Sequence, residues 1–190
     1  MSKSRRAPLI TDEIDLAAAK IRAGGVVAYP TEYCFGLGCD PSNGEAVRRI
    51  LRIKRRPVQK GLILIAGGVD QLKPYVDEIP DEVLATWPGP YTWLLTPRPG
   101  VAKWVTGRHA RIALRVTAHP RAAALCRLVG GAIVSTSANR AGEVPARSVR
   151  EVARRLASEC DCVLSGRVGG LQQPTSIRDA VTGQVIRASR

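Results

Sequence analysis

The sequence predicts an α/β domain, and two observations support that prediction. Apolar runs of strand length alternate along the chain with helical patterns, and the turns between them carry Gly and Pro. The chain has 190 residues, of which 45% are hydrophobic, and this is enough to fill one core. No Pro/Ser-rich linker or internal repeat divides it, so we expect a single domain.

Eight short runs are predicted to be strands because β-branched and other apolar residues dominate them. Polar motifs stand at the ends of these runs, which places candidate functional side chains at strand ends. In chain order the predicted strands are Val26–Tyr29, Leu62–Ala66, Thr92–Thr96, Ile112–Val116, Ala132–Ser135, Cys162–Leu164, Ser176–Asp179 and Val185–Arg187.

Six segments are predicted to be helices, and several of them begin with Thr, Ser, Asn or Asp in cap position. They are Thr11–Ala23, Gly44–Arg55, Val69–Tyr75, Asp81–Trp87, Pro120–Leu128 and Ser148–Ser158. Before the second of these, Ser42 and Glu45 have the spacing of a capping box. One face of this helix is apolar. Its other face is either a solvated surface or a surface that follows phosphate groups, and it carries Arg48, Arg49, Arg52 and Arg55.

The charge of the chain predicts anionic ligands. Lys and Arg total 29 against 16 Asp and Glu, so the formal net charge is +13 and the pI is near 10.3. This excess favours attraction to the phosphates of nucleotides, RNA or DNA. The basic segment Met1–Leu9 lacks the apolar stretch of a signal peptide, and no segment approaches the ~20 apolar residues that span a bilayer. We therefore expect a cytoplasmic protein without membrane contact.

The cysteines and histidines do not predict a zinc site. The cysteines are odd in number and lack Cys-x-x-Cys spacing, and there are two histidines, His109 and His119. We expect buried, reduced cysteines that act as small apolar side chains. Cys34 is of particular interest because it lies inside a polar motif. The five cysteines are Cys34, Cys39, Cys126, Cys160 and Cys162.

Two segments predict a nucleotide site. The first, Lys54–Lys60, places cations at the entrance of the apolar run Gly61–Ala66, which suits a triphosphate. The second, Ser135–Asn139, ends another apolar run and offers closely spaced hydroxyl and amide groups. Standard nucleotide fingerprints are missing, because there is no P-loop and Gly36-Leu37-Gly38 lacks the third glycine of a dinucleotide turn. Gly36–Pro41 is predicted to be a tight loop, with either a nucleotide-binding or a purely structural role.

A series of motifs resembles the YrdC/TsaC family in content and order. The motifs are Tyr29–Pro41, Lys54-x-Arg56 with Lys60, Trp87–Thr92, Thr106–Arg108, Ala113–Val116, His119–Pro120 and Ser137-x-Asn139. The resemblance covers nearly the whole chain. It implies a single YrdC-like domain over residues 1–190, with a core of about 11–188 and a twisted, mixed parallel and antiparallel sheet flanked by helices. The short form of the family is expected, since the longer form has an additional C-terminal domain and no residues remain for it after Arg190.

The resemblance also implies an activity. Members of this family are threonylcarbamoyl-AMP synthases, nucleotidyltransferases that convert L-threonine, bicarbonate or CO2 and ATP into threonylcarbamoyl-adenylate and pyrophosphate. Partner proteins then pass the threonylcarbamoyl group to the adenosine next to the anticodon of tRNAs that read codons beginning with A. Mg²⁺ is expected to share the charge of the ATP phosphates.

Site residues are carried over from the family's motifs. The resemblance implies catalytic roles for Lys54, Arg56, Ser137 and Asn139. It implies an ATP site formed by Lys54, Arg56, Lys60, Arg111, Ser137, Asn139 and Arg187. It implies a threonine site formed by Thr31, Tyr33, Arg115, Ser135 and Ser176, in which the planar fork of Arg115 suits the carboxylate. It implies no protein metal ligand.

Each of these assignments has a structural alternative. Lys60 is also suited to protect a strand edge, Ser137 and Asn139 to form a turn, and Arg115 to be the partner in an internal salt bridge. Two places depart from the family's pattern. Tyr33-Cys34 stands where smaller or aliphatic residues are usual, and Ile65 stands where the longer form often has histidine.

A non-catalytic module that binds double-stranded RNA or tRNA is the alternative function, since a basic domain can bind RNA without chemistry. The chain lacks an aromatic RNP strand, a Gly-x-x-Gly clamp and an arginine-rich tail, and aromatic residues make up 4% of it. RNA binding and synthesis are also compatible on one molecule.

Overall fold

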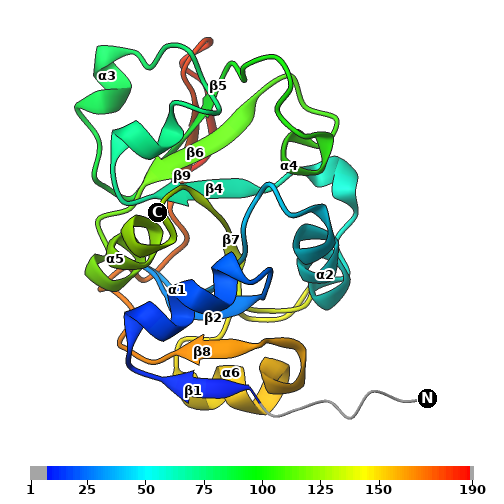
Figure 1. Cartoon of the computed structure of the whole chain (residues 1–190). Coiled ribbons are helices and arrows are strands. Elements are labelled where there is room, and N and C mark those ends of the chain that lie inside the picture. Colours follow the sequence, from blue (N-terminus) through cyan, green and yellow to red (C-terminus); the bar gives the residue numbers. More distant parts are fainter. Residues whose placement is uncertain (1–7, 189–190) are drawn as a thin grey trace.

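One mixed sheet organises the molecule (Figure 1). The computed structural model describes residues 8–188, so the predicted basic segment before Pro8 lies outside the described residues. The strand order is β1-β8-β2-β3-β7-β4-β6-β5-β9-β10. The strands are β1 Leu9–Thr11, β2 Val27–Pro30, β3 Phe35–Gly38, β4 Ile63–Ala66, β5 Tyr91–Leu95, β6 Ile112–Val116, β7 Ile133–Ser137, β8 Cys162–Leu164, β9 Ser176–Asp179 and β10 Val185–Arg187.

Parallel and antiparallel pairs mix within this sheet. Strands β1–β8, β2–β8, β4–β6 and β5–β9 are parallel, and the remaining neighbours are antiparallel. The predicted α/β class with a mixed sheet is therefore confirmed. The helices are α1 Ile14–Arg22, α2 Gly44–Lys54, α3 Asp81–Leu84, α4 Lys103–Thr106, α5 Pro120–Val129 and α6 Val149–Leu156, with 3₁₀ turns η1 Val58–Lys60, η2 Val69–Leu72 and η3 Ala157–Glu159.

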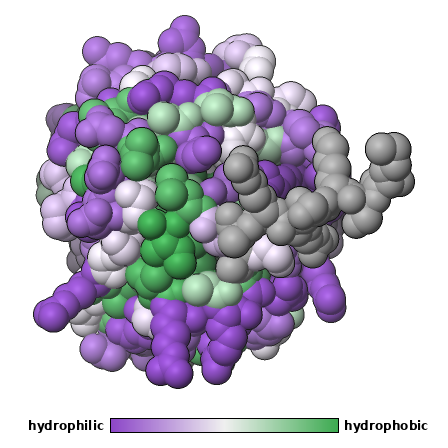
Figure 2. Space-filling view, turned by 60° about the horizontal axis from the view of Figure 1, so that its bottom comes forward, coloured by the Kyte–Doolittle hydropathy of each residue, from purple (hydrophilic) through white to green (hydrophobic). Residues whose placement is uncertain are grey.

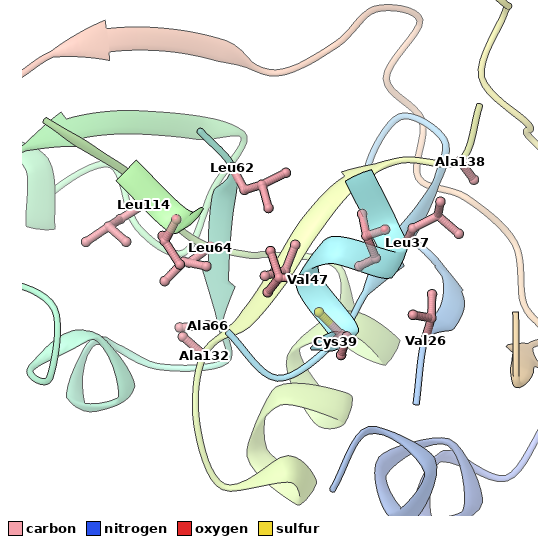
Figure 3. Packing of buried hydrophobic residues seen from close by; sticks show 14 of the residues in the cluster. Val26, Leu37, Cys39, Val47, Leu62, Leu64, Ala66, Leu114, Ala132 and Ala138 are labelled. Atoms are coloured by element: carbon pink, nitrogen blue, oxygen red, sulfur yellow. The ribbon is translucent and has the colours of Figure 1, made fainter. Parts of the chain in front are cut away.

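Two apolar clusters lie on opposite faces of the sheet. On one face α1 and α5 pack together, and Ile21 and Leu125 meet Tyr29 and Ile133 of the sheet. On the other face Val47 of α2 lies in one cluster with Leu37 of β3, Leu64 of β4 and Cys39 (Figure 3). Because alternate residues of a strand face opposite sides, strands β2, β4, β7 and β8 contribute to both clusters.

Helix α2 places the predicted cationic segment. Asn43, not Ser42, is its N-cap, and the Asn43 side chain accepts hydrogen bonds from the backbone N–H groups of Glu45 and Ala46. The capping-box prediction was wrong because the Ser42 hydroxyl donates to the Asp40 carboxylate instead. The last residue of the helix is Lys54. Its C-cap, Arg55, adopts a left-handed conformation with φ of 51°.

The first half of the segment predicted as a tight loop at Gly36–Pro41 belongs to strand β3, and a turn begins only at Pro41. Strand β3 pairs with β2 and with β7, and Gly36 lies opposite Ser137. A side chain on Gly38 would approach the Tyr29 ring to 2.7 Å and the Val134 carbonyl oxygen to 2.8 Å. The two glycines therefore make room for Tyr29 across the sheet and do not mark a turn.

Replacing Gly38 with alanine is expected to destabilise the protein by about 1–3 kcal/mol, in the range of an overpacked core site. The new methyl group would meet a backbone carbonyl and a buried ring, and neither can withdraw easily. Urea unfolding of the variant measures the change. Gly130→Ala is an informative comparison: it also adds a methyl group, but nothing lies within 4 Å there and its φ of 89° introduces only backbone strain. A wild-type midpoint for Gly38→Ala would contradict this account of β3.

Several shorter elements differ from the prediction. Strand β1 and helix α4 were not predicted, because three or four residues give no clear periodicity. The helices predicted at 69–75 and 81–87 are the 3₁₀ turn η2 and the four-residue helix α3. Pro74 lies inside the first predicted helix, shortly after η2 ends, and Pro88 directly follows the second predicted helix. Proline disfavours helical conformation in the residue before it.

The face of the molecule seen in Figure 2 is mostly polar and carries an apolar area. Figure 2 shows this area on the side of the molecule that carries β1, β8 and α6. Leu9 and Ile10 on β1 and Leu16 on α1 are exposed. Within residues 8–188, no helix is long and apolar enough to cross a membrane.

Candidate functional site

Lys54 connects the two predicted nucleotide segments. Its ammonium group is buried, with 5% of the residue exposed, although it is the last residue of α2. Nζ donates to the Asn139 carbonyl oxygen at 3.0 Å and to Asn139 Oδ1 at 3.2 Å. It also contacts the Ser137 carbonyl oxygen and Ser137 Oγ. The structure thus brings together three of the four predicted catalytic residues, which we call the lysine cluster: Lys54, Ser137 and Asn139.

The loop after β7 is held in place by backbone contacts. The Ala141 N–H donates to the Lys54 carbonyl oxygen at 3.0 Å, and the Ala138 N–H donates to the Phe35 carbonyl oxygen at 2.8 Å. The amide of Asn139 also donates to the Arg140 and Glu143 carbonyl oxygens at 2.9 and 2.8 Å. Ser137 and Asn139 therefore form a fixed turn, as their structural alternative expected, and the same turn binds Lys54.

Arg56 and Lys60 follow the lysine cluster along the chain. The Arg56 guanidinium folds back onto the carbonyl oxygens of Lys60 and Gly61, at 3.1 to 3.3 Å. Burial lowers the pKa of Arg56. Lys60 is exposed at the end of η1. Arg111 stands two residues before Ala113, which pairs with Ile63, so the amino ends of β4 and β6 bring Arg111 near Gly61. Its Nε is buried without a partner.

The positive charge at this end of the sheet is not balanced by protein carboxylates. Within residues 8–188, no Asp or Glu forms a salt bridge with Lys54, Arg56, Lys60 or Arg111. Lys54, the buried member of this set, is hydrogen-bonded only to neutral oxygens, so its charge has no carboxylate partner and favours an anion nearby.

The arginines on the outer face of α2 behave differently. Arg48 and Arg52 pair with Glu45, and Arg49 pairs with Asp161. These pairs favour the interpretation of this face as an ordinary solvated surface. They also show that the unpaired cations near Lys54 are not simply a consequence of the basic composition.

Arg115 lies at the centre of a second, buried cluster on β6. Its Nη2 atom pairs with Glu32 Oε2 at 3.2 Å. Its Nη1 atom donates to Thr175 Oγ1 at 2.8 Å and to Thr92 Oγ1 at 3.3 Å. The Thr117 hydroxyl donates to the other oxygen of Glu32 at 2.6 Å. We call these residues the arginine cluster: Glu32, Thr92, Arg115, Thr117 and Thr175.

The internal salt bridge expected as the alternative for Arg115 is therefore present. It does not use the whole guanidinium group, because Nε of Arg115 is buried without a partner. The charge of Arg115 and the hydrogen bond from Thr117 lower the pKa of Glu32 below its ordinary value, although burial alone would raise it. The pair is thus ionised, and one edge of Arg115 is left for a further acceptor.

The other residues predicted to bind the substrate threonine lie around these two clusters. Ser135 is opposite Ile63 and Arg115 is opposite Ile65, so both flank the same face of β4. Ser176 is buried and its hydroxyl has no partner. The Thr31 hydroxyl is used within its own loop, where it donates to the Cys34 carbonyl oxygen at 2.7 Å.

Tyr33 and Arg187 have neighbours that the sequence did not indicate. The Arg147 guanidinium lies over the Tyr33 ring, 5.2 Å from its centre. The Arg187 guanidinium donates to the Thr175 carbonyl oxygen at 2.7 and 3.0 Å, which places Arg187 beside the arginine cluster. Burial, with the nearby charge of Arg115, lowers the pKa of Arg187.

The Cys34 thiol is buried and is influenced by charges of both clusters. Burial raises its pKa to about 11, while the charges of Lys54, Arg115 and Arg147 act in the opposite direction. The Cys34 thiol is therefore neutral at physiological pH. All five cysteines are free and buried, as predicted.

Sequence reasoning missed Glu32, Thr92, Thr117, Thr175 and Arg147. Glu32 and Thr92 belong to motifs that carried the resemblance, so their position was a usable signal. Nothing in the pattern indicated that the Glu32 carboxylate would turn inward. A surface hollow of about 520 Å³ lies elsewhere, next to Gly67, Gln71 and Arg127, and contains none of the predicted site residues.

The fold and these clusters define a class of protein: an α/β protein whose sheet gathers cations, hydroxyl groups and an amide at the ends of its strands. Comparison with known proteins gives the family. Residues 19–189 match the model of the Sua5/YciO/YrdC family, described as "Telomere recombination". The match covers most of the chain, and the chain belongs to this family.

Curated relatives agree with this assignment. A threonylcarbamoyl-AMP synthase of Stenotrophomonas maltophilia is 52% identical over 181 residues, covering 92% of this chain and 97% of that protein. A threonylcarbamoyl-AMP synthase of Alkalilimnicola ehrlichii is 56% identical over 176 residues, covering 90% and 93%.

Solved structures share the fold. The P. abyssi Sua5 structure complexed with L-threonine has a TM-score of 0.86 and 30% identity, covering 95% of this chain and 56% of that longer chain. The E. coli YciO structure has a TM-score of 0.79 and 29% identity, covering 95% and 93%.

Proposed function

We propose that this chain is a threonylcarbamoyl-AMP synthase, which makes L-threonylcarbamoyladenylate and pyrophosphate from L-threonine, bicarbonate or CO2, and ATP. The observation that carries the proposal is the lysine cluster. A buried ammonium group without a carboxylate partner is held by Ser137 and Asn139, in a chain about half identical to relatives named for this activity.

The reaction needs positioning and charge neutralisation more than covalent catalysis. The threonine amine takes up the carbon of bicarbonate or CO2 as a carbamate. An oxygen of this carbamate then attacks the α-phosphorus of ATP, and pyrophosphate leaves. Most of the rate gain in such a transfer comes from alignment and from fixed positive charge near the phosphate oxygens.

The proposed ATP site is the cationic end of β4 and β6. Lys54, Arg56 and Lys60 hold the phosphates, and Ser137 and Asn139 complete the catalytic set. Arg111 and Arg187 are proposed to contact the nucleotide. Mg²⁺ is proposed to arrive as part of the substrate MgATP. Within residues 8–188 there is no cluster of three or more His, Cys, Asp or Glu side chains that could hold a metal ion, so phosphate oxygens would supply most of its ligands.

The proposed threonine site is the arginine cluster with its surroundings. Arg115 binds the carboxylate through the part of its guanidinium group that the protein leaves free. The unpartnered hydroxyl of Ser176 supports a role in the same site. The remaining proposed residues of the pocket are Thr31, Tyr33 and Ser135.

We propose that the reaction supplies a modification of tRNA. The adenylate is an activated product, so we propose that partner proteins transfer its threonylcarbamoyl group to tRNA, in the cytoplasm. The net charge of +13 supports contact between tRNA and the surface. RNA binding as the whole function is not favoured, because the ammonium group of Lys54 is buried away from any duplex on the surface.

Pyrophosphate release by the purified protein tests the proposal. With MgATP and bicarbonate, we expect release that depends on L-threonine. Equal release with and without threonine would indicate simple ATP hydrolysis. No release from folded protein, together with salt-sensitive binding of duplex RNA, would favour the RNA-binding alternative.

Binding of ATP is expected to weaken as the pH rises above about 8. Burial, with a smaller effect of the neighbouring Arg56, lowers the pKa of Lys54 to about 8. The ammonium is charged below this pKa, so its attraction for phosphate is present at lower pH and is lost as the amine deprotonates. Because bound phosphate favours the charged form, the midpoint in the complex lies higher. Equilibrium dialysis across this pH range measures the effect. The slope should vanish in Lys54→Met, and a wild-type affinity that is flat across the range would contradict the prediction.

A further inference from the structure

The buried carboxylate of Glu32 is the feature of the site that the proposed reaction leaves unused. It is 7% exposed and lies in the loop between β2 and β3. One of its oxygens accepts from Arg115 Nη2, and the other accepts from the Thr117 hydroxyl. Each oxygen thus has a partner inside the protein, and these contacts tie the carboxylate of Glu32 to Arg115 and Thr117.

Backbone contacts fix the position of Glu32. The Gly169 N–H donates to the Thr31 carbonyl oxygen at 2.9 Å, and the Leu171 N–H donates to the Glu32 carbonyl oxygen at 3.3 Å. Gly169 approaches so closely that a side chain there would come within 2.7 Å of that carbonyl oxygen. The segment 169–171 thus clamps the loop from outside.

The partners of Arg115 determine which of its donors remain free. A guanidinium group has five N–H donors. Three of these donors are used: two on Nη1 donate to Thr92 and Thr175, and one on Nη2 donates to Glu32. Nε remains buried without a partner. These hydrogen bonds fix the plane of the guanidinium group. A fixed plane allows it to bind a planar carboxylate in one defined geometry.

We propose that Glu32 is a positioning residue, which orients the guanidinium group of Arg115 so that its free edge receives the carboxylate of the amino-acid substrate; this inference rests on the proposed function. Glu32 also offsets the charge of Arg115, so recognition there depends on hydrogen-bond geometry more than on net charge. The cations Lys54, Arg147 and Arg187 around the same region keep it attractive to anions.

Glu32→Gln tests this proposal in the pyrophosphate-release assay. Glutamine keeps the shape of the side chain and one acceptor for the Thr117 hydroxyl. Its neutral amide cannot form a charge-assisted hydrogen bond with the guanidinium group of Arg115. We expect the KM for L-threonine to rise roughly tenfold or more, as for the loss of a charge-assisted hydrogen bond, with the KM for ATP changed less than about twofold. Asp161→Asn is the matched control, because it removes a carboxylate from another ion pair, with Arg49, and should move neither constant.

A substrate analogue separates positioning from general damage to the fold. L-threoninol lacks the carboxylate that Arg115 is proposed to receive. Its inhibition constant should therefore be nearly the same in wild type and in Glu32→Gln, whereas the KM for threonine differs. Equal losses for threonine and threoninol, or a parallel loss for ATP, would overturn the proposal, as would a wild-type KM for threonine.

Thr117→Val carries the same test if Glu32→Gln does not fold. This variant keeps the charge of Glu32 but removes the hydroxyl that fixes one of its oxygens. The KM for L-threonine is again expected to rise more than the KM for ATP, but by a smaller factor than in Glu32→Gln. An unchanged KM for L-threonine would overturn the proposal. A wild-type protein without threonine-dependent release would instead overturn the proposed function itself, and the role of Glu32 in substrate binding with it.

Discussion

Replacing Lys54 with methionine is expected to lower turnover roughly 100- to 1,000-fold, with a modest loss of thermal stability because the hydrogen bonds to Ser137 and Asn139 are removed. The ammonium group would lie against phosphate oxygens in the proposed complex, where charge develops as pyrophosphate leaves. Its burial already opposes the charged form in the free protein, as the lowered pKa of about 8 indicates. The fold gains little from this charge, so its removal should affect activity far more than stability.

The double variant Lys54→Ala, Arg56→Ala extends this test and is expected to abolish measurable turnover. Arg55→Ala is the matched control, because Arg55 is an exposed cation between the two and forms no salt bridge within the described residues. Turnover and melting temperature should be compared for all variants. Equal losses in Arg55→Ala and the double variant would mean that overall charge, and not this site, supports the reaction.

Replacing Arg115 with alanine is expected to destabilise the protein by roughly 3–5 kcal/mol, besides removing the use of threonine. The change leaves the carboxylate of Glu32 buried with only Thr117 as a partner. An unpaired buried carboxylate is among the costliest defects in a fold, and its pKa would rise above the ordinary value because burial is then unopposed.

The pH dependence of that loss follows from the sign of the shift. In the wild type the pKa of Glu32 is lowered, so its contribution to stability is present above the unfolded pKa and is lost as the pH falls. In Arg115→Ala the raised pKa makes the penalty largest at neutral pH and smaller in acid. Urea unfolding at neutral and acidic pH measures both effects. The double variant Glu32→Gln, Arg115→Ala should recover much of the stability, and a double variant as unstable as the single one would contradict the assignment.

The sequence was sufficient for the fold class and for most of the longer elements, because their apolar periodicity spans several turns or strand residues. It failed for short elements and for glycines that are required by packing against a neighbouring strand and not by a turn. Gly36 and Gly38 resembled a loop, yet they lie in β3 because the Tyr29 ring needs their space. That requirement comes from a neighbouring strand, and local sequence does not contain it.

The site was predictable to a similar degree. Lys54, Ser137 and Asn139 were named from motifs far apart in the sequence, and they are in contact in the structure. Glu32 was missed although it lies in a quoted motif, because an acidic residue in a loop normally faces solvent. Its burial depends on Arg115, which is remote in sequence and becomes a neighbour only when the sheet forms.

Identification of the reaction product tests the central claim most directly. The purified protein would be incubated with MgATP, L-threonine and ¹³C-labelled bicarbonate, and the nucleotides would be analysed by mass spectrometry. The account predicts an adenylate that contains threonine and one labelled carbon, absent when threonine is omitted and absent in Lys54→Met. Nucleotide products without threonine or without the label, from folded wild-type protein, would contradict it.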